Sequence, residues 1–272
     1  MKFFGFLILT ILLLADVANA GLKENAIKIL PSKEIVVTGH PDYAPIIWKS
    51  AESKHLQGVA VELVEMAFKE LGVKVKTFNA STWGRAQEEV KEGRADMLLP
   101  PYTNAERLVS YQYYSSPILM DETAVFIKKG TKIIFKKIED LSKFSGAAII
   151  DDSFGNEFDS ISKAKLKIER LATTEQCFEF LMSDRANYMI AGYNSGMAVA
   201  ARLGFENNIS VLPKRIITTG IYAPISKKSA WNKPEIHEFV NQKILEYGKK
   251  GIVKKLEKKY WATFKKEMAQ KK

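Results

Sequence analysis

The sequence contains a single cysteine and only three histidines among its 272 residues. One cysteine cannot form an internal disulfide, so we expect packing to stabilise the fold. Cys177 lies in an apolar-faced helical stretch, which indicates a core position rather than a nucleophile. The histidines, His40, His55 and His237, lie far apart without the spacing of metal ligands. We therefore expect no metal site and no cofactor.

Long hydrophobic runs are scarce as well. The longest, 3–14, is too short to span a bilayer comfortably, since a membrane helix needs about 20 apolar residues. Lys2 precedes this run, and the small-x-small triplet 18–20 follows it, which is the layout of a cleavable secretory signal peptide over 1–20. An uncleaved anchor is the alternative. No cysteine lies at the cleavage point to carry a lipid, so we expect an exported, soluble chain from Gly21 onward.

Acidic charge is in deficit, and the net charge is +10. The segment 254–272 holds eight lysines and two glutamates, and thus supplies 8 − 2 = +6 of this charge. Because the excess is terminal and no recognition motif accompanies it, nucleic-acid binding is disfavoured. We expect the lysines to form the solvated face of a last helix, whose inner face carries Leu256, Tyr260 and Phe264. Attraction to anionic membranes would be a weak side effect.

Strand and helix patterns alternate along the chain and then restart near residue 145. The first series includes a β-branched run at 33–39 and a helix at 58–72, with Ala60, Leu63, Ala67 and Leu71 on one face. This alternation predicts an α/β protein with two lobes, each a mostly parallel sheet flanked by helices. Ligands of such sheets bind in the loops at the carboxyl ends of the strands. Those loops are expected at 41–45, 100–107, 151–156 and 192–196.

One of these loops, PPYTNAERLV at 100–109, combines a helix start with an arginine. Thr103 and Glu106 have the spacing of a capping box, and Arg107 follows directly. A helix N-terminus offers unpaired N–H groups, and a guanidinium adds a two-pronged donor that matches a carboxylate or phosphate. The segment therefore either holds an anionic ligand or is a helix start with a surface arginine.

Several motifs in sequence order resemble those of the bacterial extracellular solute-binding proteins of family 3, the periplasmic receptors of polar amino-acid ABC importers. They are HPDYAPIIW, GVAVELVEMAFKELGV, W-x-R-A with EGRADM behind it, TNAER, YYSSPILMDETAVFIKKG, DDSFGNEFD and EYGKKGIVKKLEKKYW. No single motif is specific, but their order and spacing cover about residues 33–262. The resemblance implies a periplasmic-binding-protein fold of type II, whose lobes close on a ligand about two crossover strands.

By this resemblance, lobe one spans 21–124 plus 219–272, and lobe two spans 125–218. The crossovers are expected near 123–126 and 218–222.

The resemblance also assigns roles to particular residues. Arg107 matches the arginine that forks onto a ligand α-carboxylate, and Thr103 matches the hydroxyl and amide at the same helix start. Tyr43 matches an aromatic that covers the ligand. The loop Ser153, Phe154, Gly155 and Asn156 matches amides that close over the carboxylate, and Thr174 begins a helix whose tip faces the cleft.

Further candidates come from residue types near the expected loops. The aromatic residues in or beside these loops could line a ligand-binding site. Each could equally pack within a lobe, and Trp48 is the weakest candidate. Arg85 could be a second clamp or a surface arginine near Glu88 and Glu89. The full candidate ligand-binding set is Tyr43, Trp83, Arg85, Pro101, Tyr102, Thr103, Arg107, Ser153, Phe154, Gly155, Asn156, Thr174 and Tyr193.

One departure from the family pattern concerns the ligand ammonium. The aspartate that usually pairs with it aligns with Gly192, and no acid lies within 192–196. A buried ammonium without a carboxylate partner is costly. Either another acid replaces it, with Asp42, Asp151 and Asp152 as candidates, or the ligand lacks an α-amino group.

We therefore expect a periplasmic, non-enzymatic and monomeric receptor. It would capture a small carboxylate-bearing solute, an amino acid or related organic acid, and present it to a membrane ABC permease. An enzyme similar to the cyclohexadienyl dehydratases is the alternative, with Asp151, Asp152 or Glu122 as general acid. A second alternative is a ligand-sensing partner of a membrane receptor.

Overall fold

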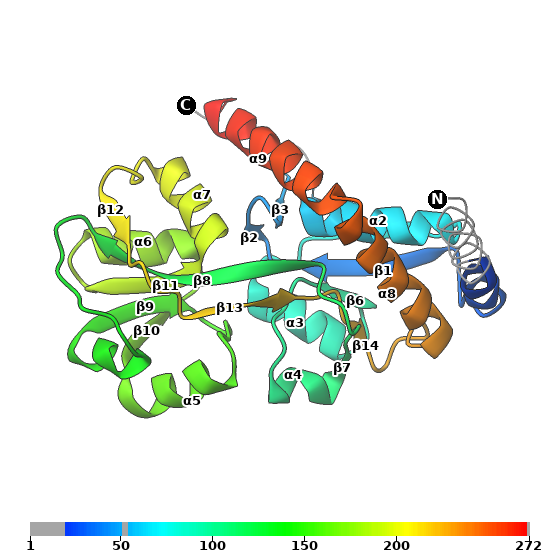
Figure 1. Ribbon diagram of the computed structural model, residues 1–272, viewed down its shortest axis with the longest axis horizontal. Coiled ribbons are helices and arrows are strands. Elements are labelled where there is room, and N and C mark those ends of the chain that lie inside the picture. Colours follow the sequence, from blue (N-terminus) through cyan, green and yellow to red (C-terminus); the bar gives the residue numbers. More distant parts are fainter. Residues whose placement is uncertain (1–19, 51–53, 271–272) are drawn as a thin grey trace, which may run out of the picture.

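The computed structural model describes residues 20–50 and 54–270. The expected signal peptide therefore lies, apart from Ala20, outside the described residues. Two helix-covered sheets form two lobes side by side (Figure 1). Within the described ranges, no helix has the length and apolar character needed to cross a membrane.

The first sheet has the strand order β5-β1-β6-β14-β7. Its strands β1, β5 and β6 are parallel, whereas β14 runs antiparallel to β6 and β7. Side chains of β1 alternate between the two faces, because Ile35 and Val37 join one buried cluster while Val36 packs against another. The strands are β1 (Glu34–Gly39), β5 (Lys74–Thr77), β6 (Met97–Leu99), β7 (Tyr111–Gln112) and β14 (Ile225–Ser226).

Helices cover both faces of this sheet. The predicted face of α2 is confirmed, since Ala60, Leu63, Ala67 and Leu71 are all buried. On one side α2 packs with α8 and α9, and on the other α3 lies against β1, β6 and β14 (Figure 1). The helices are α2 (Val59–Glu70), α3 (Trp83–Lys91), α4 (Ala105–Ser110), α8 (Pro234–Lys249) and α9 (Ile252–Gln270).

The second sheet has the order β10-β9-β11-β8-β12, and β13 also pairs with β8. Cys177 is fully buried between this sheet and its helices, which confirms its predicted core position. The strands are β8 (Leu119–Lys128), β9 (Ser145–Ile149), β10 (Lys167–Leu171), β11 (Tyr188–Gly192), β12 (Ile209–Val211) and β13 (Ile217–Ile221). The helices are η1 (Ile138–Lys143), α5 (Asn156–Lys165), α6 (Thr174–Met182) and α7 (Tyr193–Leu203).

The sheets are mixed rather than mostly parallel, which corrects the prediction. Strands β9, β10 and β11 are parallel, but β8 runs antiparallel to β11, β12 and β13. The reason is topological, since the chain enters the second sheet along β8 and returns along β13 to β14. Alternation of strands and helices detects parallel crossover units but not strands that link two lobes.

Strands β8 and β13 run side by side between the two lobes (Figure 1). Their register pairs Thr123 with Ile217 and Leu119 with Ile221. The chain then reaches the first sheet, where Pro224 accepts a hydrogen bond from the backbone of Leu98. The predicted crossovers at 123–126 and 218–222 overlap these strands, while the exact lobe boundaries stay a prediction.

Helix α9 crosses from the first lobe toward α7 of the second (Figure 1). Its Phe264 forms a buried cluster with Ala44 and Trp48 of the first lobe and Ala198 of α7. Glu267 fixes the helix by accepting hydrogen bonds from Trp48 Nε1 at 2.9 Å and from the Gln57 amide at 2.6 Å. Trp48 therefore packs against α9 and does not line the cavity between the lobes.

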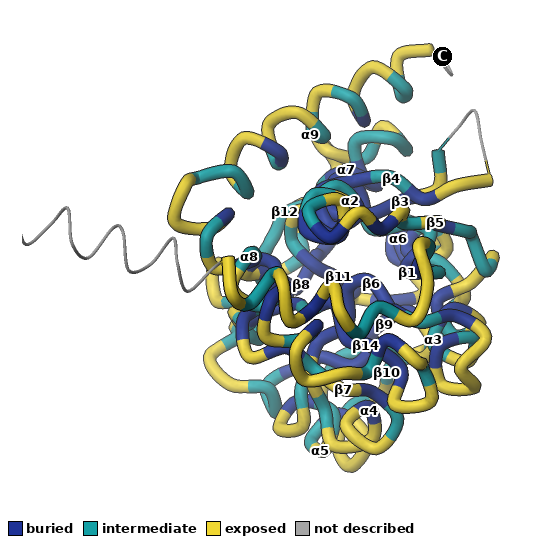
Figure 2. Tube along the Cα trace, turned by 90° about the vertical axis from the view of Figure 1, so that its right-hand side faces the viewer, coloured by how far each residue is buried: buried dark blue, intermediate teal, exposed yellow. Residues whose placement is uncertain are grey.

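The remaining face of α9 is exposed (Figure 2). Leu256 and Phe264 are buried and Tyr260 is half-buried, which confirms the predicted inner face. A short sheet beneath the helix consists of β2 (Asp42–Tyr43), β3 (Ile47–Lys49) and β4 (Leu56–Gln57).

We expect Phe264→Ala to lower the free energy of unfolding by about 3 kcal/mol, because it removes a buried ring and leaves a cavity beside Trp48. Urea unfolding measures the change. The neighbouring Lys266→Ala, at an exposed position of the same helix, should change it by less than about 0.5 kcal/mol. Equal effects of the two substitutions would contradict the packing role of α9.

Candidate functional site

A small cavity lies where the two lobes meet. Its volume is about 20 Å³, enough for about one water molecule. A wider groove of about 870 Å³ continues from it past Arg107 and Asp152. The cavity is lined by His40, Tyr43, Trp83, Pro100, Pro101, Tyr102 and Arg107 of the first lobe and by Asp152, Phe154 and Gly192 of the second.

Arg107 reaches this cavity from the short helix α4. The helix begins at Ala105, and the Asn104 side chain caps it by accepting a 2.8 Å hydrogen bond from the Arg107 backbone N–H. The predicted capping box on Thr103 is therefore wrong, and Thr103 is exposed one position before the cap. Both residues would reach the third helical N–H over the same spacing, and asparagine is as good a cap as threonine or better.

The Arg107 guanidinium is buried and bound by neutral groups. Its Nε donates to the Gln87 side chain at 3.1 Å, and Nη1 donates to the carbonyl of Tyr102 at 3.1 Å. Across the lobe boundary, Nη2 donates to the carbonyl of Asp151 at 3.4 Å. The Cζ atom lies 5.4 Å from the centre of the Trp83 ring.

The guanidinium forms no salt bridge within the described part of the chain. A buried cation without a formal counter-ion is electrostatically costly, and a carboxylate would match its fork. The geometry thus makes the Arg107 guanidinium suited to an anion, while anion binding itself stays a prediction.

A buried acid that the sequence analysis missed lies on β8. Asp121 is 1% exposed, and its Oδ2 accepts hydrogen bonds from the hydroxyls of Tyr43 and Tyr102, the latter at 2.5 Å. Its Oδ1 has no partner among the described residues. Burial raises the pKa of Asp121. Burial likewise raises the pKa of both tyrosines, and the Asp121 charge adds to this.

The position of Tyr43 explains why no acid stands at position 192. Gly192 caps α7, and a Cβ atom built on it would overlap the Tyr43 hydroxyl. A side chain at Gly192 and the Tyr43–Asp121 hydrogen bond therefore exclude each other. An aspartate at this position would require Tyr43 to move.

The three acids proposed to replace the missing aspartate at position 192 have different surroundings. Asp42 is paired with Arg202, and Asp151 is exposed, with its carboxylate against Gly84 of α3. Only Asp152 lines the cavity. Burial raises its pKa to about 7, although the nearby arginine charges act in the opposite direction.

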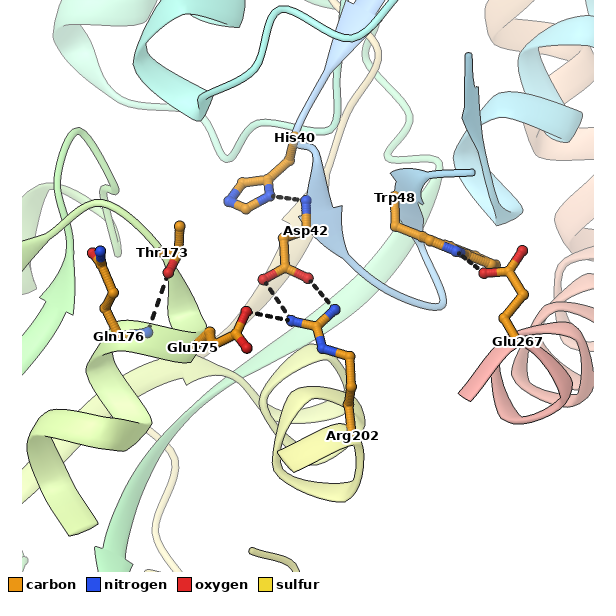
Figure 3. Close-up of polar contacts among 8 residues, drawn as sticks. All are labelled: His40, Asp42, Trp48, Thr173, Glu175, Gln176, Arg202 and Glu267. Carbon is orange, nitrogen blue, oxygen red and sulfur yellow. Dashed lines mark hydrogen bonds and ion pairs between the residues drawn. The ribbon is translucent and has the colours of Figure 1, made fainter. Parts of the chain in front are cut away.

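Two further polar groups, on His40 and Trp83, face one another at the cavity wall. Their ring centres lie 5.2 Å apart, and both side chains are buried. The Asp42 backbone N–H donates to His40 Nδ1 at 3.1 Å (Figure 3). His40 Nε2 and Trp83 Nε1 have no hydrogen-bond partner within the described ranges. Burial lowers the pKa of His40 to about 4.

Polar contacts join the lobes on both sides of the cavity. On one side Arg202 of α7 binds the Asp42 carboxylate at 3.0 and 3.3 Å and lies 3.5 Å from Glu175 of α6 (Figure 3). On the other side the Ala105 backbone N–H donates to Asn156 Oδ1 at 3.3 Å. Direct contacts between the lobes thus lie near the cavity.

The structure brings together part of the candidate set from the sequence. Tyr43, Trp83, Pro101, Tyr102, Arg107 and Phe154 line the cavity, and Ser153 lines the adjoining groove. The sequence analysis missed His40, Pro100 and Asp121. His40 directly precedes the expected 41–45 loop and Pro100 lies in the 100–107 loop, whereas the burial of Asp121 has no signal in the sequence.

The other candidates lie outside the cavity lining. Arg85 and Thr103 are exposed, and Thr174 is buried at the start of α6, where Thr173 caps the helix by accepting from the Gln176 N–H at 3.1 Å. The Gln176 side chain in turn accepts a hydrogen bond from the backbone N–H of Ala172 at 3.0 Å.

Three candidates in the second lobe have contacts of their own. Tyr193 lies beneath the Arg215 guanidinium, 4.6 Å from its Cζ. Gly155 caps α5, and Asn156 makes the contact with α4 described above. Ligand binding by all members of the set stays a prediction.

Comparison with known proteins places the chain in a family context. The family model described as bacterial extracellular solute-binding proteins, family 3, matches residues 35–263. A comparison with curated proteins finds no match.

Solved structures similar to this chain are two-lobed binding proteins. A mutant of ArgBP from T. maritima is 18% identical, with a TM-score of 0.70, covering 87% of this chain and 99% of that one. The amino acid ABC transporter substrate-binding protein AbpA from Streptococcus pneumoniae, bound to L-arginine, is 16% identical, with a TM-score of 0.71 and coverages of 85% and 96%. The ancestral amino acid-binding protein AncCDT-1, a precursor of cyclohexadienyl dehydratase, is 22% identical, with a TM-score of 0.67 and coverages of 87% and 99%. At these identities the likeness shows the fold.

Asp152→Asn should become more stabilising, relative to the unchanged protein, as the pH rises from about 4 to about 8. The folded-state pKa of Asp152, about 7, lies above its ordinary value of 3.8, so the folded state binds more protons in this window. Ionisation of Asp152 therefore lowers stability as the pH rises through the window, and asparagine is spared this loss. Melting temperatures measured at several pH values test the prediction.

The exposed Glu206→Gln controls for the loss of one carboxylate. A melting-temperature difference for Asp152→Asn that is constant with pH, or that falls as the pH rises, would refute the buried environment of this acid.

Proposed function

Because the chain belongs to the bacterial extracellular solute-binding proteins, family 3, we propose that it captures a small carboxylate-bearing solute between its lobes. The solute is an amino acid or a related organic acid. In this proposal the protein works outside the cytoplasmic membrane and delivers the solute to an ABC permease. It acts as a monomer and does not transform its ligand.

The observation that carries the proposal is the buried Arg107 guanidinium, which forms no salt bridge with any residue of 20–50 or 54–270. Three of its contacts go to neutral oxygens, and the longest, at 3.4 Å, goes to Asp151 of the other lobe. A charge-assisted bond to a ligand carboxylate is stronger than this contact. A ligand carboxylate can therefore take the place of the Asp151 carbonyl on Nη2.

The connection between the lobes supports a binding cycle. Strands β8 and β13 form a two-strand link of the kind that bends in hinged closure. Separation of the lobes would remove the Asp151 carbonyl and the Arg202–Asp42 ion pair, and would admit the solute to Arg107. Closure would then exclude water from the carboxylate and strengthen its bonds.

Two observations support an amino acid over a simple acid. Similar structures include proteins bound to arginine and to glutamine. Asp152 lines the cavity, and Asp121 lies directly behind the lining residues Tyr43 and Tyr102. These two carboxyl groups could pair with an ammonium in place of the residue missing at Gly192. In this proposal these two acids set the preference for a cationic group.

A second candidate function is catalysis by Asp152. A carboxyl group with a pKa of about 7 beside a carboxylate-binding arginine has the properties of a general acid. The structural neighbour AncCDT-1, a precursor of cyclohexadienyl dehydratase, has this fold. Conversion of prephenate or arogenate to an aromatic product would establish catalysis, and absence of turnover would leave binding as the function.

The ligand class is tested by thermal unfolding against a panel of solutes. The protein is first unfolded and refolded to remove any bound solute, and the panel contains amino acids, dicarboxylates, aromatic acids, betaines and short peptides. A ligand at 100 times its Kd stabilises by about 2.7 kcal/mol, which raises the melting temperature by roughly 5–10 °C. A response to amino acids alone supports the roles of Asp121 and Asp152, whereas a response to acids without an ammonium excludes them.

Arg107→Ala should abolish binding of the panel ligand, and Arg107→Lys should weaken it at least tenfold, because lysine keeps the charge but loses the fork. Isothermal titration calorimetry gives the affinities. Arg94→Ala, which removes an exposed arginine paired with Glu89, is the matched control and should leave the affinity unchanged. Wild-type affinity in Arg107→Ala would refute the anion clamp.

A further inference from the structure

The polar groups on one wall of the cavity are hydrogen-bond donors. His40 and Trp83 line the cavity beside Arg107, and they are 6% and 4% exposed. Their atoms Nε2 and Nε1 are buried and have no partner in the described part of the chain. A buried polar atom without a partner costs free energy, so such atoms in a cavity indicate a missing partner.

The tautomer of His40 follows from its neighbour in the chain. The Asp42 backbone N–H donates to Nδ1 at 3.1 Å, so Nδ1 must present its lone pair (Figure 3). A neutral imidazole with an acceptor at Nδ1 carries its proton at Nε2. Burial and the nearby Arg107 charge both disfavour the charged ring. His40 Nε2 is therefore an N–H donor.

The indole Nε1 of Trp83 is a donor in every state. The Trp83 ring also lies between the two other groups, 5.2 Å from the His40 ring centre and 5.4 Å from Arg107 Cζ. The wall thus offers two neutral N–H groups next to a guanidinium. Its natural partner is a group with several acceptor atoms and a negative charge.

We propose that His40 Nε2–H and Trp83 Nε1–H donate hydrogen bonds to the ligand's carboxylate together with Arg107. This inference rests on the proposed function and names two further specificity-determining residues. The donors discriminate against ligands whose group at this wall is itself a donor, because two buried N–H groups would then stay unpaired.

Asp42 is a positioning residue in this arrangement. Its backbone orients His40, while its carboxylate is held by Arg202 of the opposite lobe at 3.0 and 3.3 Å. The Arg202–Asp42 contact between the lobes thus holds Asp42 in place, and the Asp42 backbone in turn sets the His40 tautomer. Closure and orientation of the donor are linked through one residue.

The test uses acetate as the probe, because it presents a carboxylate and nothing else that is polar. Acetate is titrated into the uniformly ¹⁵N-labelled full-length protein up to millimolar concentration, and sodium chloride at equal ionic strength is the control. The side-chain N–H resonances of His40, Trp83 and Arg107 are followed by NMR, with assignments from His40→Gln, Trp83→Phe and Arg107→Lys. We expect all three to shift with one apparent affinity, and long-range spectra to show His40 neutral with its proton on Nε2.

Variants then separate the donor from the ring. The acetate affinity, measured from the shift of the Arg107 side-chain N–H resonances, should fall about 10- to 100-fold in His40→Leu, because this variant removes a hydrogen bond to a charged acceptor. His40→Gln keeps an N–H donor at a similar distance and should retain affinity within about threefold of wild type. Trp83→Phe keeps the ring and should lose affinity like His40→Leu.

The outcomes distinguish this inference from the proposed function. Shifts at Arg107 without shifts at His40 and Trp83, or a proton on Nδ1 of His40, would overturn the inference and leave the arginine clamp intact. If sodium chloride reproduces every shift, both the donor wall and the carboxylate site are refuted. Equal acetate affinities in His40→Gln and His40→Leu would also overturn the inference. If His40→Leu does not fold, Trp83→Phe and the wild-type spectra decide the question.

Discussion

A buried guanidinium without a formal counter-ion is the constraint on which the site depends. Arg107 lies where the two lobes meet, and its N–H groups bind neutral oxygens from Gln87, Tyr102 and Asp151. Two of these partners belong to its own lobe and one to the other. Bringing the lobes together therefore adds the last of these contacts to the cation. An anion that enters between the lobes would offset the desolvation that the neutral contacts meet only in part.

The rest of the fold allows the two lobes to close and to separate. Strands β8 and β13 give the lobes a narrow covalent link, and Arg202 adds an ion pair to Asp42 at the cavity edge. Hydrogen bonds of Glu62 and Glu267 fasten helix α9 to the first lobe, and its Phe264 packs against the small side chain of Ala198 in the second lobe. A small apolar contact of this kind can separate at low cost.

The cavity also shows how one residue can change what a site is able to bind. Gly192 leaves room for the Tyr43 hydroxyl, and that hydroxyl reaches Asp121 on the crossover strand. The carboxyl groups nearest the cavity are consequently those of Asp121 on β8 and of Asp152, and the end of β11 carries none. Donor groups and carboxyl groups of both lobes meet around a space of about 20 Å³. In so small a space each unpaired polar group contributes strongly to selectivity.

The sequence by itself determined the elements whose signals are local. The 3.6-residue period fixed the buried face of α2, and the charge pattern fixed the inner face of α9. Tertiary structure alone decided that β8 runs antiparallel and that Asp121 is buried under Tyr43, a residue 78 positions away. Periodicity and capping depend on neighbours within a few residues, whereas burial and pairing depend on which distant segments meet.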